Sequence, residues 1–262
     1  MIIREIKKKL KNGGKVLGTM VTVFQNPDIV RILKECGYDF IIVDCEHGSF
    51  DYGEVARILG MARAVGLPTL VRIPEIRREP VLKYMEMGAD GLLLPNTETK
   101  EEAELLVKYS KYAPLGDRGV SLSRPHTGYV KVNGREYMDQ SNSDTLLMCQ
   151  IESRVGVENV EEIIGTEGID VAFVGPNDMS QSYGILGEFD NPVIIGAFEK
   201  ILSAAKRAGK SAGVHFGNQD ALVSWIKAGY QINMCNSDVG LLMSGAKASV
   251  GYLTAQTDTK GQ

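Results

Sequence analysis

Acidic and histidine side chains follow directly after one of the most apolar runs in the chain. Residues 40–43 read Phe-Ile-Ile-Val, and the next four are Asp44, Cys45, Glu46 and His47. A histidine at such a place can take up or release a proton near neutral pH, so His47 is a candidate general base. On residue type alone, a histidine that caps an element or fills the core is an equal alternative.

The change from an apolar run to polar side chains recurs along the chain. The side chains at the other run ends are Arg72, Gln150, Glu152, Asn177, Asp178, His215 and Asn236. A structural polar group explains any one of these positions, but it explains the whole set poorly. Among them, Arg72 carries a planar guanidinium that suits a carboxylate or an enolate oxygen of a substrate.

Two of these run ends indicate a metal site. Gln150 and Glu152 are two residues apart, so in a strand they share one face. A buried carboxylate is costly without a partner, and a divalent cation would supply one for Glu152, with Asp178 as the second oxygen ligand. Carboxylate ligands favour Mg²⁺ or Mn²⁺ over Zn²⁺. The alternative is a buried salt bridge between Glu152 and Arg72 with no metal.

Apolar runs separated by amphipathic segments must position these side chains. Short continuous apolar runs are typical of parallel strands buried on both faces. The expected strands cover residues 17–23, 40–45, 69–73, 91–95, 146–151, 171–175, 211–215 and 231–235. They predict an α/β fold, a (β/α)8 TIM barrel in one domain over residues 1–262, with its site at the carboxyl ends of the strands. An open doubly wound sheet is the alternative.

Three segments stand outside this repeat. Residues 1–10 have helical apolar spacing and predict a short helix that closes the bottom of the barrel. Residues 113–144 form a long stretch, rich in Gly, Ser, Asn and Arg, before the fifth strand. Such a stretch is either a functional lid, here suited to cover an anionic ligand, or a tolerated surface insertion. We expect the polar tail after Tyr252 to be frayed.

The composition bears on partners and location. The formal net charge is -4, with 44% hydrophobic and 24% charged residues, so we expect no nucleic-acid and no anionic-membrane partner. No apolar run is long enough to span a bilayer. The four cysteines form no C-x-x-C pair, which predicts reduced thiols and a cytoplasmic location.

The motifs, taken in order, resemble the HpcH/HpaI aldolase family of metal-dependent class II pyruvate aldolases. The resemblance runs from about Gly18 to Val250. Its strongest parts are residues 43–47 (VDCEH), 71–72 (VR), 88–89 (GA), 92–95 (LLLP), 118–120 (RGV), 150–152 (QIE) and 175–180 (GPNDMS). Each motif alone is weak, but their order and spacing together are specific.

The resemblance implies three catalytic residues. His47 would be the base, and Arg72 would stabilise the developing enolate. Glu86 stands where the family has an aspartate that raises the basicity of the histidine, so here that role falls to a side chain one methylene longer. Two further departures from the family, Cys45 and the segment 215–218 (His-Phe-Gly-Asn) where several relatives are apolar, bear on substrate choice.

The resemblance also implies ligand contacts and a reaction. Glu152 and Asp178 would hold the cation, Mg²⁺ or Mn²⁺ with Co²⁺ as a further option. Gln150 and Asn177, together with Asp178, would bind the pyruvate part of a small-molecule substrate. The implied reaction is reversible cleavage of a 4-hydroxy-2-oxo acid to pyruvate and an aldehyde through a metal-bound enolate. Oxaloacetate decarboxylation or acyl-CoA cleavage by the same chemistry is the alternative, and we expect a homo-oligomer, a hexamer or a trimer.

Two hypotheses from other classes compete with an aldolase. A phosphate-binding barrel isomerase would use the loops after the seventh and eighth strands, including residues 236–238, but these loops lack a clear glycine-rich phosphate cradle. A barrel that only binds a ligand would leave the acids at the strand ends without a purpose.

Overall fold

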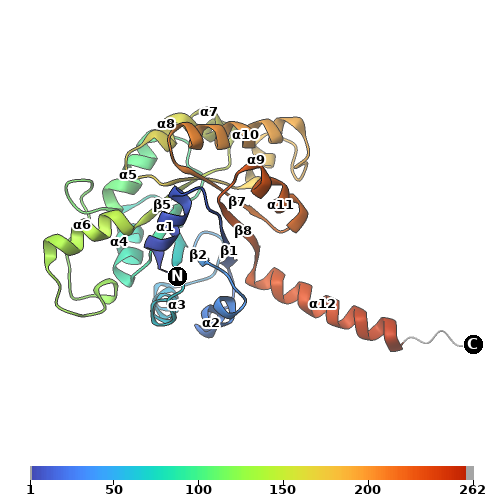
Figure 1. The fold of residues 1–262 in the computed structure, drawn as a ribbon, viewed down its shortest axis with the longest axis horizontal. Helices are drawn as coiled ribbons and strands as arrows, with labels where there is room; N and C mark the ends of the chain where they lie inside the picture. The colour runs from blue at the N-terminus through green and yellow to red at the C-terminus, as the bar shows by residue number, and fades with distance from the viewer. Residues whose placement is uncertain (1, 258–262) are drawn as a thin grey trace, which may run out of the picture.

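The eight expected strands close into a barrel. They are β1 (Val16–Val21), β2 (Phe40–Asp44), β3 (Thr69–Arg72), β4 (Gly91–Leu94), β5 (Leu146–Ile151), β6 (Val171–Val174), β7 (Ser211–Phe216) and β8 (Ile232–Ser237). In the computed structural model, which describes residues 2–257, neighbouring strands pair in parallel and in sequence order (Figure 1). Because β8 also pairs with β1, the barrel is confirmed and the open sheet is excluded.

The chain forms helices before, between and after the strands, and most of them lie around the outside of the barrel. They are α1 (Ile3–Lys11), α2 (Asp28–Glu35), α3 (Tyr52–Val65), α4 (Arg78–Met87), α5 (Lys100–Ser110), η1 (Pro125–Thr127), α6 (Gly134–Asp144), α7 (Arg154–Glu158), α8 (Val160–Gly165), α9 (Pro176–Ser182), α10 (Pro192–Arg207), α11 (Gln219–Ala228) and α12 (Asp238–Thr257). Asp51 with Glu54 forms a capping box at the start of α3, and Thr99 with Glu102 forms one at the start of α5. Each box satisfies backbone N–H groups at the start of its helix.

Strand side chains alternate between two separate apolar cores. Outward residues such as Val43 and Val174 pack against the helices, while inward residues such as Ile42 and Phe173 fill the barrel interior. A glycine makes room for one interior ring, because a Cβ added at Gly213 would lie 2.5 Å from the Phe173 side chain. The next inward positions toward the carboxyl ends are the polar residues that end the runs.

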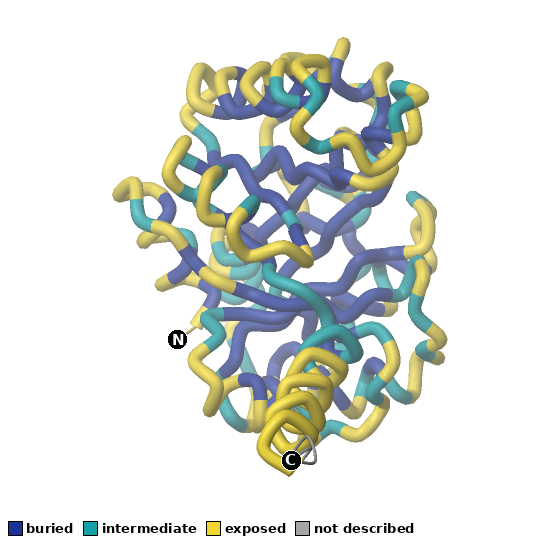
Figure 2. The backbone as a smooth tube through the Cα atoms, turned by 90° about the vertical axis from the view of Figure 1, so that its right-hand side faces the viewer, coloured by how far each residue is buried: buried dark blue, intermediate teal, exposed yellow. Residues whose placement is uncertain are grey.

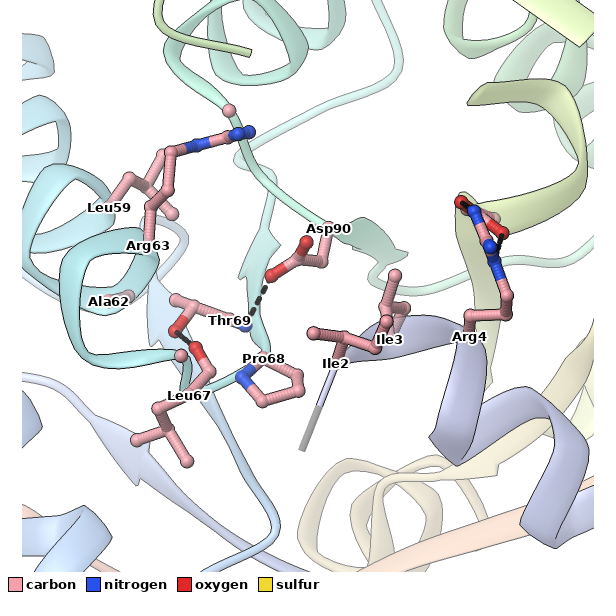
Figure 3. A pocket seen from close by; sticks show the side chains of 13 residues that line it. Ile2, Ile3, Arg4, Leu59, Ala62, Arg63, Leu67, Pro68, Thr69 and Asp90 are labelled. Carbon is pink, nitrogen blue, oxygen red and sulfur yellow. Dashed lines mark hydrogen bonds and ion pairs between the residues drawn. The ribbon is translucent and has the colours of Figure 1, made fainter. Parts of the chain in front are cut away.

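The N-terminal helix closes the bottom of the barrel, as expected. Ile3, Ile6 and Leu10 of α1 belong to the same apolar core as the inward strand residues. Beside α1 lies a small pocket of about 190 Å³, where Asp90 accepts a 2.9 Å hydrogen bond from the backbone N–H of Thr69 (Figure 3). The amino ends of the strands are therefore covered, and the carboxyl ends stay open.

The long segment before β5 packs on the side of the barrel. Its Arg118 side chain is buried, with the guanidinium 4.6 Å from the Tyr112 ring centroid and Nη2 3.2 Å from Glu86 Oε1. None of the described residues 113–144 lines the cavity at the barrel mouth. Within one protomer the segment does not cover the cavity, because Arg118 is held on the side of the barrel. The lid interpretation stays a prediction for the site of a neighbouring protomer.

The C-terminal helix α12 leaves the barrel and extends away from it (Figure 1). Every residue from 242 to 257 is exposed, including Leu242 and Leu253 (Figure 2). The expectation of a frayed tail after Tyr252 was wrong as far as Thr257, and the rest of that tail lies outside the described residues. Over residues 2–257, no helix combines the length and apolarity needed to cross a membrane.

Candidate active site

A cavity of about 640 Å³ opens at the carboxyl ends of the strands. Because parallel strands all end on this side, the polar run ends come together there. Six of the seven predicted site residues line or adjoin it: His47, Arg72, Gln150, Asn177 and Asp178 line the cavity, and Glu152 contacts the Gln150 side chain. The seventh, Glu86, lies elsewhere.

Arg72 is held by two acids from the end of β2. Its Nε and Nη2 donate to Asp44 Oδ1 and Oδ2 at 2.9 and 2.6 Å, and Nη1 lies 3.0 Å from Glu46 Oε2. The Asp44 and Arg72 side chains are buried, with 1% and 8% of their surface exposed. Burial lowers the pKa of Arg72, but the hydrogen bonds and charges of the two acids outweigh it and raise the pKa. The guanidinium is therefore a fixed cation.

His47 lies at the rim of the cavity. Its side chain is 66% exposed, and Nε2 lies 3.8 Å from Glu46 Oε2. The backbone N–H groups of Glu46 and His47 both donate to Asp44 Oδ1, at 3.1 and 3.3 Å. Asp44 thus fixes both the arginine and the turn that carries the histidine.

Glu152 is a buried carboxylate that directly follows β5, two strands along the barrel from Arg72 of β3. Its Oε1 accepts a 2.7 Å hydrogen bond from the Asn96 N–H, and its Oε2 accepts one from Gln150 Nε2. Burial raises the pKa of Glu152 to about 7; these two hydrogen bonds oppose the rise, and the charges of Asp178 and Glu46 add to it. The salt bridge to Arg72, the metal-free alternative, is not among the ion pairs of the described residues.

The place of Glu152 depends on a glycine that sequence reasoning did not assign a role. A Cβ added at Gly175 would lie 2.1 Å from Glu152 Oε2 and 2.7 Å from Gln150 Nε2. The carboxylate therefore lies over the position where any other residue would have its side chain. Asp178 and Asn177 are exposed in the first turn of α9, which begins at Pro176.

These residues fit a divalent cation. Glu152 and Asp178 supply carboxylate oxygens, and Gln150 Oε1 is a buried oxygen with no hydrogen-bond partner. Burial is the main cause of the raised pKa of Glu152, and repulsion from Asp178 and Glu46 adds to it; a cation between the acids would relieve this repulsion. In the part of the chain described, no three His, Cys, Asp or Glu side chains form a complete metal cage, so the remaining ligands would be water and substrate.

Within one protomer Glu86 does not reach His47. It lies in the last turn of α4, which runs back from the carboxyl ends of the strands, so it lies toward the opposite end of the barrel. Its Oε1 lies 3.2 Å from Arg118 Nη2 and 3.4 Å from His126 Nε2. Burial raises the pKa of Glu86, but hydrogen bonds and charges from His126 and Arg118 bring the pKa below its usual value.

The segment proposed for a phosphate-binding isomerase has a structural role. Asp238 accepts hydrogen bonds from the backbone N–H groups of Thr22, Val23 and Phe24, at 3.1, 3.0 and 2.9 Å, and from the Thr22 hydroxyl at 2.7 Å. Burial opposes ionisation, but these bonds lower the pKa of Asp238 below its usual value. Its carboxylate ties the loop after β1 to the end of β8 and repels a phosphate there.

The fold, the site and a family match define the chain as a carbon–carbon lyase built on a (β/α)8 barrel. A family model described as HpcH/HpaI aldolase/citrate lyase matches residues 20–244. The chain belongs to this family.

Individual relatives agree with the family. The 5-keto-4-deoxy-D-glucarate aldolase of Escherichia coli O9:H4 (strain HS) is 32% identical over 229 residues, which cover 86% of this chain and 88% of the relative. The crystal structure of an HpcH/HpaI aldolase from Desulfitobacterium hafniense DCB-2 has a TM-score of 0.90 at 35% identity, covering 95% of this chain and 96% of that one. The citrate synthase SbnG has a TM-score of 0.86 at 25% identity, covering 96% and 98%.

Proposed function

We propose that the chain is a metal-dependent aldolase that reversibly cleaves a 4-hydroxy-2-oxo acid to pyruvate and an aldehyde. The observation that carries this proposal is that a buried cation and two acids meet at one cavity. Arg72 and Asp178 line the cavity, and the buried Glu152 adjoins it through its contact with Gln150. A 2-oxo acid matches this arrangement, because its oxygens can bind both a cation held by the acids and the guanidinium.

The proposed roles follow from the contacts. Glu152 and Asp178 would hold the cation, with Mg²⁺ or Mn²⁺ as the oxygen-preferring candidates and Co²⁺ as a further option. When bound, the cation would polarise the 2-oxo group as a Lewis acid. Gln150, whose Oε1 has no partner, and Asn177 at the start of α9 would contact the oxo-acid part of the substrate.

The protein residues on the Arg72 side would handle charge and protons. Arg72, fixed by Asp44, stabilises negative charge on the oxo oxygen as the bond between C3 and C4 breaks. His47 takes the proton from the C4 hydroxyl during cleavage, and a proton is returned to C3. Glu46 is the acid beside His47 in the protomer. The prediction that Glu86 supports His47 then requires a second protomer.

Metal removal tests this proposal. Protein dialysed against EDTA is assayed for addition of pyruvate to glycolaldehyde, before and after Mg²⁺ or Mn²⁺ is restored. We expect activity to disappear and return with the metal. Full activity in the dialysed protein would rule out the metal mechanism. A His47→Ala variant as active as wild type would rule out the base assignment.

The family description and the SbnG neighbour favour a second candidate. The family description names citrate lyase, and the neighbour SbnG is a citrate synthase. Decarboxylation of oxaloacetate would produce the same pyruvate enolate as aldol cleavage. Metal-dependent release of CO₂ from oxaloacetate, at a rate above that of 4-hydroxy-2-oxo acid cleavage, would favour this candidate over the aldolase.

A homo-oligomer is part of the proposal, and α12 supports it. The outward face of β1 lacks cover at Leu17, which is 44% exposed, although a helix covers such a position in a complete barrel. On α12, which leaves the barrel, the apolar side chains Leu242 and Leu253 are each 60% exposed. Exchange of α12 between two protomers would bury both surfaces, and a hexamer can be built from three such pairs.

A cytoplasmic location and a single domain over residues 1–262 remain proposals. The four cysteines are free in the structure, which supports a reducing compartment. The strands of the barrel run from residue 16 to residue 237, which supports one domain.

A further inference from the structure

His215 is a polar side chain that faces the cavity from the wall beside Glu152. In β7, the neighbours Val214 and Phe216 point to the outer core, so His215 points inward. It lines the same cavity as Arg72 and Asp178. The reaction proposed above gives it no role.

The register places His215 next to the ligand that Glu152 would hold. Ile151 pairs with Val174, and Val174 pairs with Val214. The next residues, Glu152, Gly175 and His215, therefore form one row across three strands. Since Glu152 Oε2 lies over Gly175, about one strand spacing of 4.8 Å separates the carboxylate from the strand of His215.

One hydrogen bond decides what the imidazole offers to this ligand. His215 Nε2 lies 2.9 Å from the backbone oxygen of Asn236. A carbonyl oxygen only accepts, so Nε2 carries the ring proton. Burial lowers the pKa of His215, with the Asn236 oxygen opposing, so the ring is neutral at pH 7. Nδ1 then has a free lone pair, and no described residue donates to it.

An unpaired acceptor beside a methyl group is unfavourable. A site built to bond a hydroxyl discriminates against an analogue that lacks it, because its own polar atom is then left without a partner. Pyruvate has only a methyl group at C3. A 2-oxo acid with a C3 hydroxyl would donate to Nδ1.

We propose, as an inference that rests on the proposed function, that His215 makes the enzyme select a 2-oxo acid with a hydroxyl on C3. This oxo acid is the substrate that forms the enolate. This narrows the 4-hydroxy-2-oxo acids of the proposed function to 3,4-dihydroxy-2-oxo acids. Their cleavage releases 3-hydroxypyruvate in place of pyruvate, so pyruvate is the poorer partner. The role of His215 is to position and select, and His47 keeps the proton transfer.

The test compares two oxo acids with one aldehyde. The kcat/KM for addition to glycolaldehyde is measured with 3-hydroxypyruvate and with pyruvate, using wild type, His215→Leu and His215→Gln, each with Mg²⁺. We expect wild type to favour 3-hydroxypyruvate at least about tenfold. The ratio should fall about tenfold in His215→Leu and recover in part in His215→Gln, whose amide oxygen accepts a hydrogen bond.

The measured quantity is kcat/KM with 3-hydroxypyruvate divided by kcat/KM with pyruvate. A mutation that slows the reaction of both oxo acids equally leaves this ratio unchanged. A wild-type ratio of one or below, or a ratio unchanged in His215→Leu, would overturn the role of His215. If His215→Leu does not fold, the wild-type and His215→Gln ratios still decide. Metal-dependent exchange of C3 protons in D₂O is measured in parallel with both oxo acids. Absence of exchange with both acids would instead remove the proposed function.

Discussion

Arg72 binds Asp44 through both carboxylate oxygens, at 2.9 and 2.6 Å, although the two residues are 28 positions apart. They are direct register partners on neighbouring strands. Asp44 also accepts the N–H groups that shape the turn to His47. One buried pair thus fixes both the cation that faces the substrate and the loop that carries the base.

Replacing either member of this pair should impair both stability and activity. Asp44→Asn leaves a buried guanidinium with Glu46 as its remaining acid, so we expect the free energy of unfolding to fall by about 3 kcal/mol. Arg72→Lys loses the two-pronged contact, and kcat should fall at least about 100-fold. Urea unfolding and aldol addition rates check these values. Arg154→Lys, at an exposed pair with Glu158, is the control and should change little.

Gly175→Ala should weaken metal binding while leaving the fold intact. The new Cβ would lie 2.1 Å from Glu152 Oε2, so the carboxylate must leave its place. We expect the Mn²⁺ affinity, measured by calorimetry, to fall at least about tenfold. Gly196→Ala in α10 is the matched control, because no atom lies within 4 Å of its added Cβ, and it should gain about 1 kcal/mol of stability. Equal Mn²⁺ affinity in both variants would contradict the described position of Glu152.

Much of this fold follows from sequence pattern. The apolar runs predicted all eight strands. A strand that is buried on both faces is apolar throughout, so the first polar residue marks where it ends. Seven of the polar residues at the run ends line the cavity, and Glu152 adjoins it; the seven are Asp44, His47, Arg72, Gln150, Asn177, Asp178 and His215. β8 continues through Asn236 and Ser237, which the apolar pattern left outside the strand.

Other features depend on relations that a sequence does not display. The pairing of Asp44 with Arg72 needs the register of β2 and β3. Glu86 matches a motif, but its distance from His47 follows from the direction of α4, which returns to the amino ends of the strands. α12 includes Gly240, Gly245 and Gly251, which disfavour a helix, and whether it packs on its own barrel depends on tertiary contacts.

Asp90, in the pocket beside α1 (Figure 3), should make stability depend on pH. Burial raises its pKa from 3.8 to about 6, with the Thr69 N–H and Arg63 opposing. Between these values the folded state binds a proton that the unfolded state lacks, so this group's contribution to stability falls as pH rises from about 4 to 6. Above pH 6 the ionised, buried group costs up to about 3 kcal/mol.

The variant Asp90→Asn isolates this effect. The free energy of unfolding of the variant minus that of wild type should be larger by about 2 kcal/mol at pH 7 than at pH 4.5, so the variant gains relative stability as the pH rises. Urea unfolding at the two pH values measures the difference. If the difference between variant and wild type is the same at both values, Asp90 does not titrate in this range.

Charges on α12 should dissociate the proposed oligomer. Leu242→Glu and Leu253→Glu change side chains that are 60% exposed in the protomer, so a free helix would tolerate them at a cost of about 0.5 kcal/mol or less. If α12 packs on a second protomer, each variant buries a charge and lowers the sedimentation coefficient at micromolar concentration. Lys247→Ala on the same helix is the control. Unchanged sedimentation of both variants would argue against exchange of α12.

The most direct test of the central claim is exchange of the C3 protons of the 2-oxo acid in D₂O without any aldehyde. Proton NMR of pyruvate and of 3-hydroxypyruvate reports enolate formation before a carbon–carbon bond is made. With Mg²⁺ or Mn²⁺, wild type should remove the proton signal of at least one acid. Metal-free wild type and Glu152→Gln with metal should be slower by at least about 100-fold. Equally fast exchange in metal-free wild type or in Glu152→Gln would contradict the account.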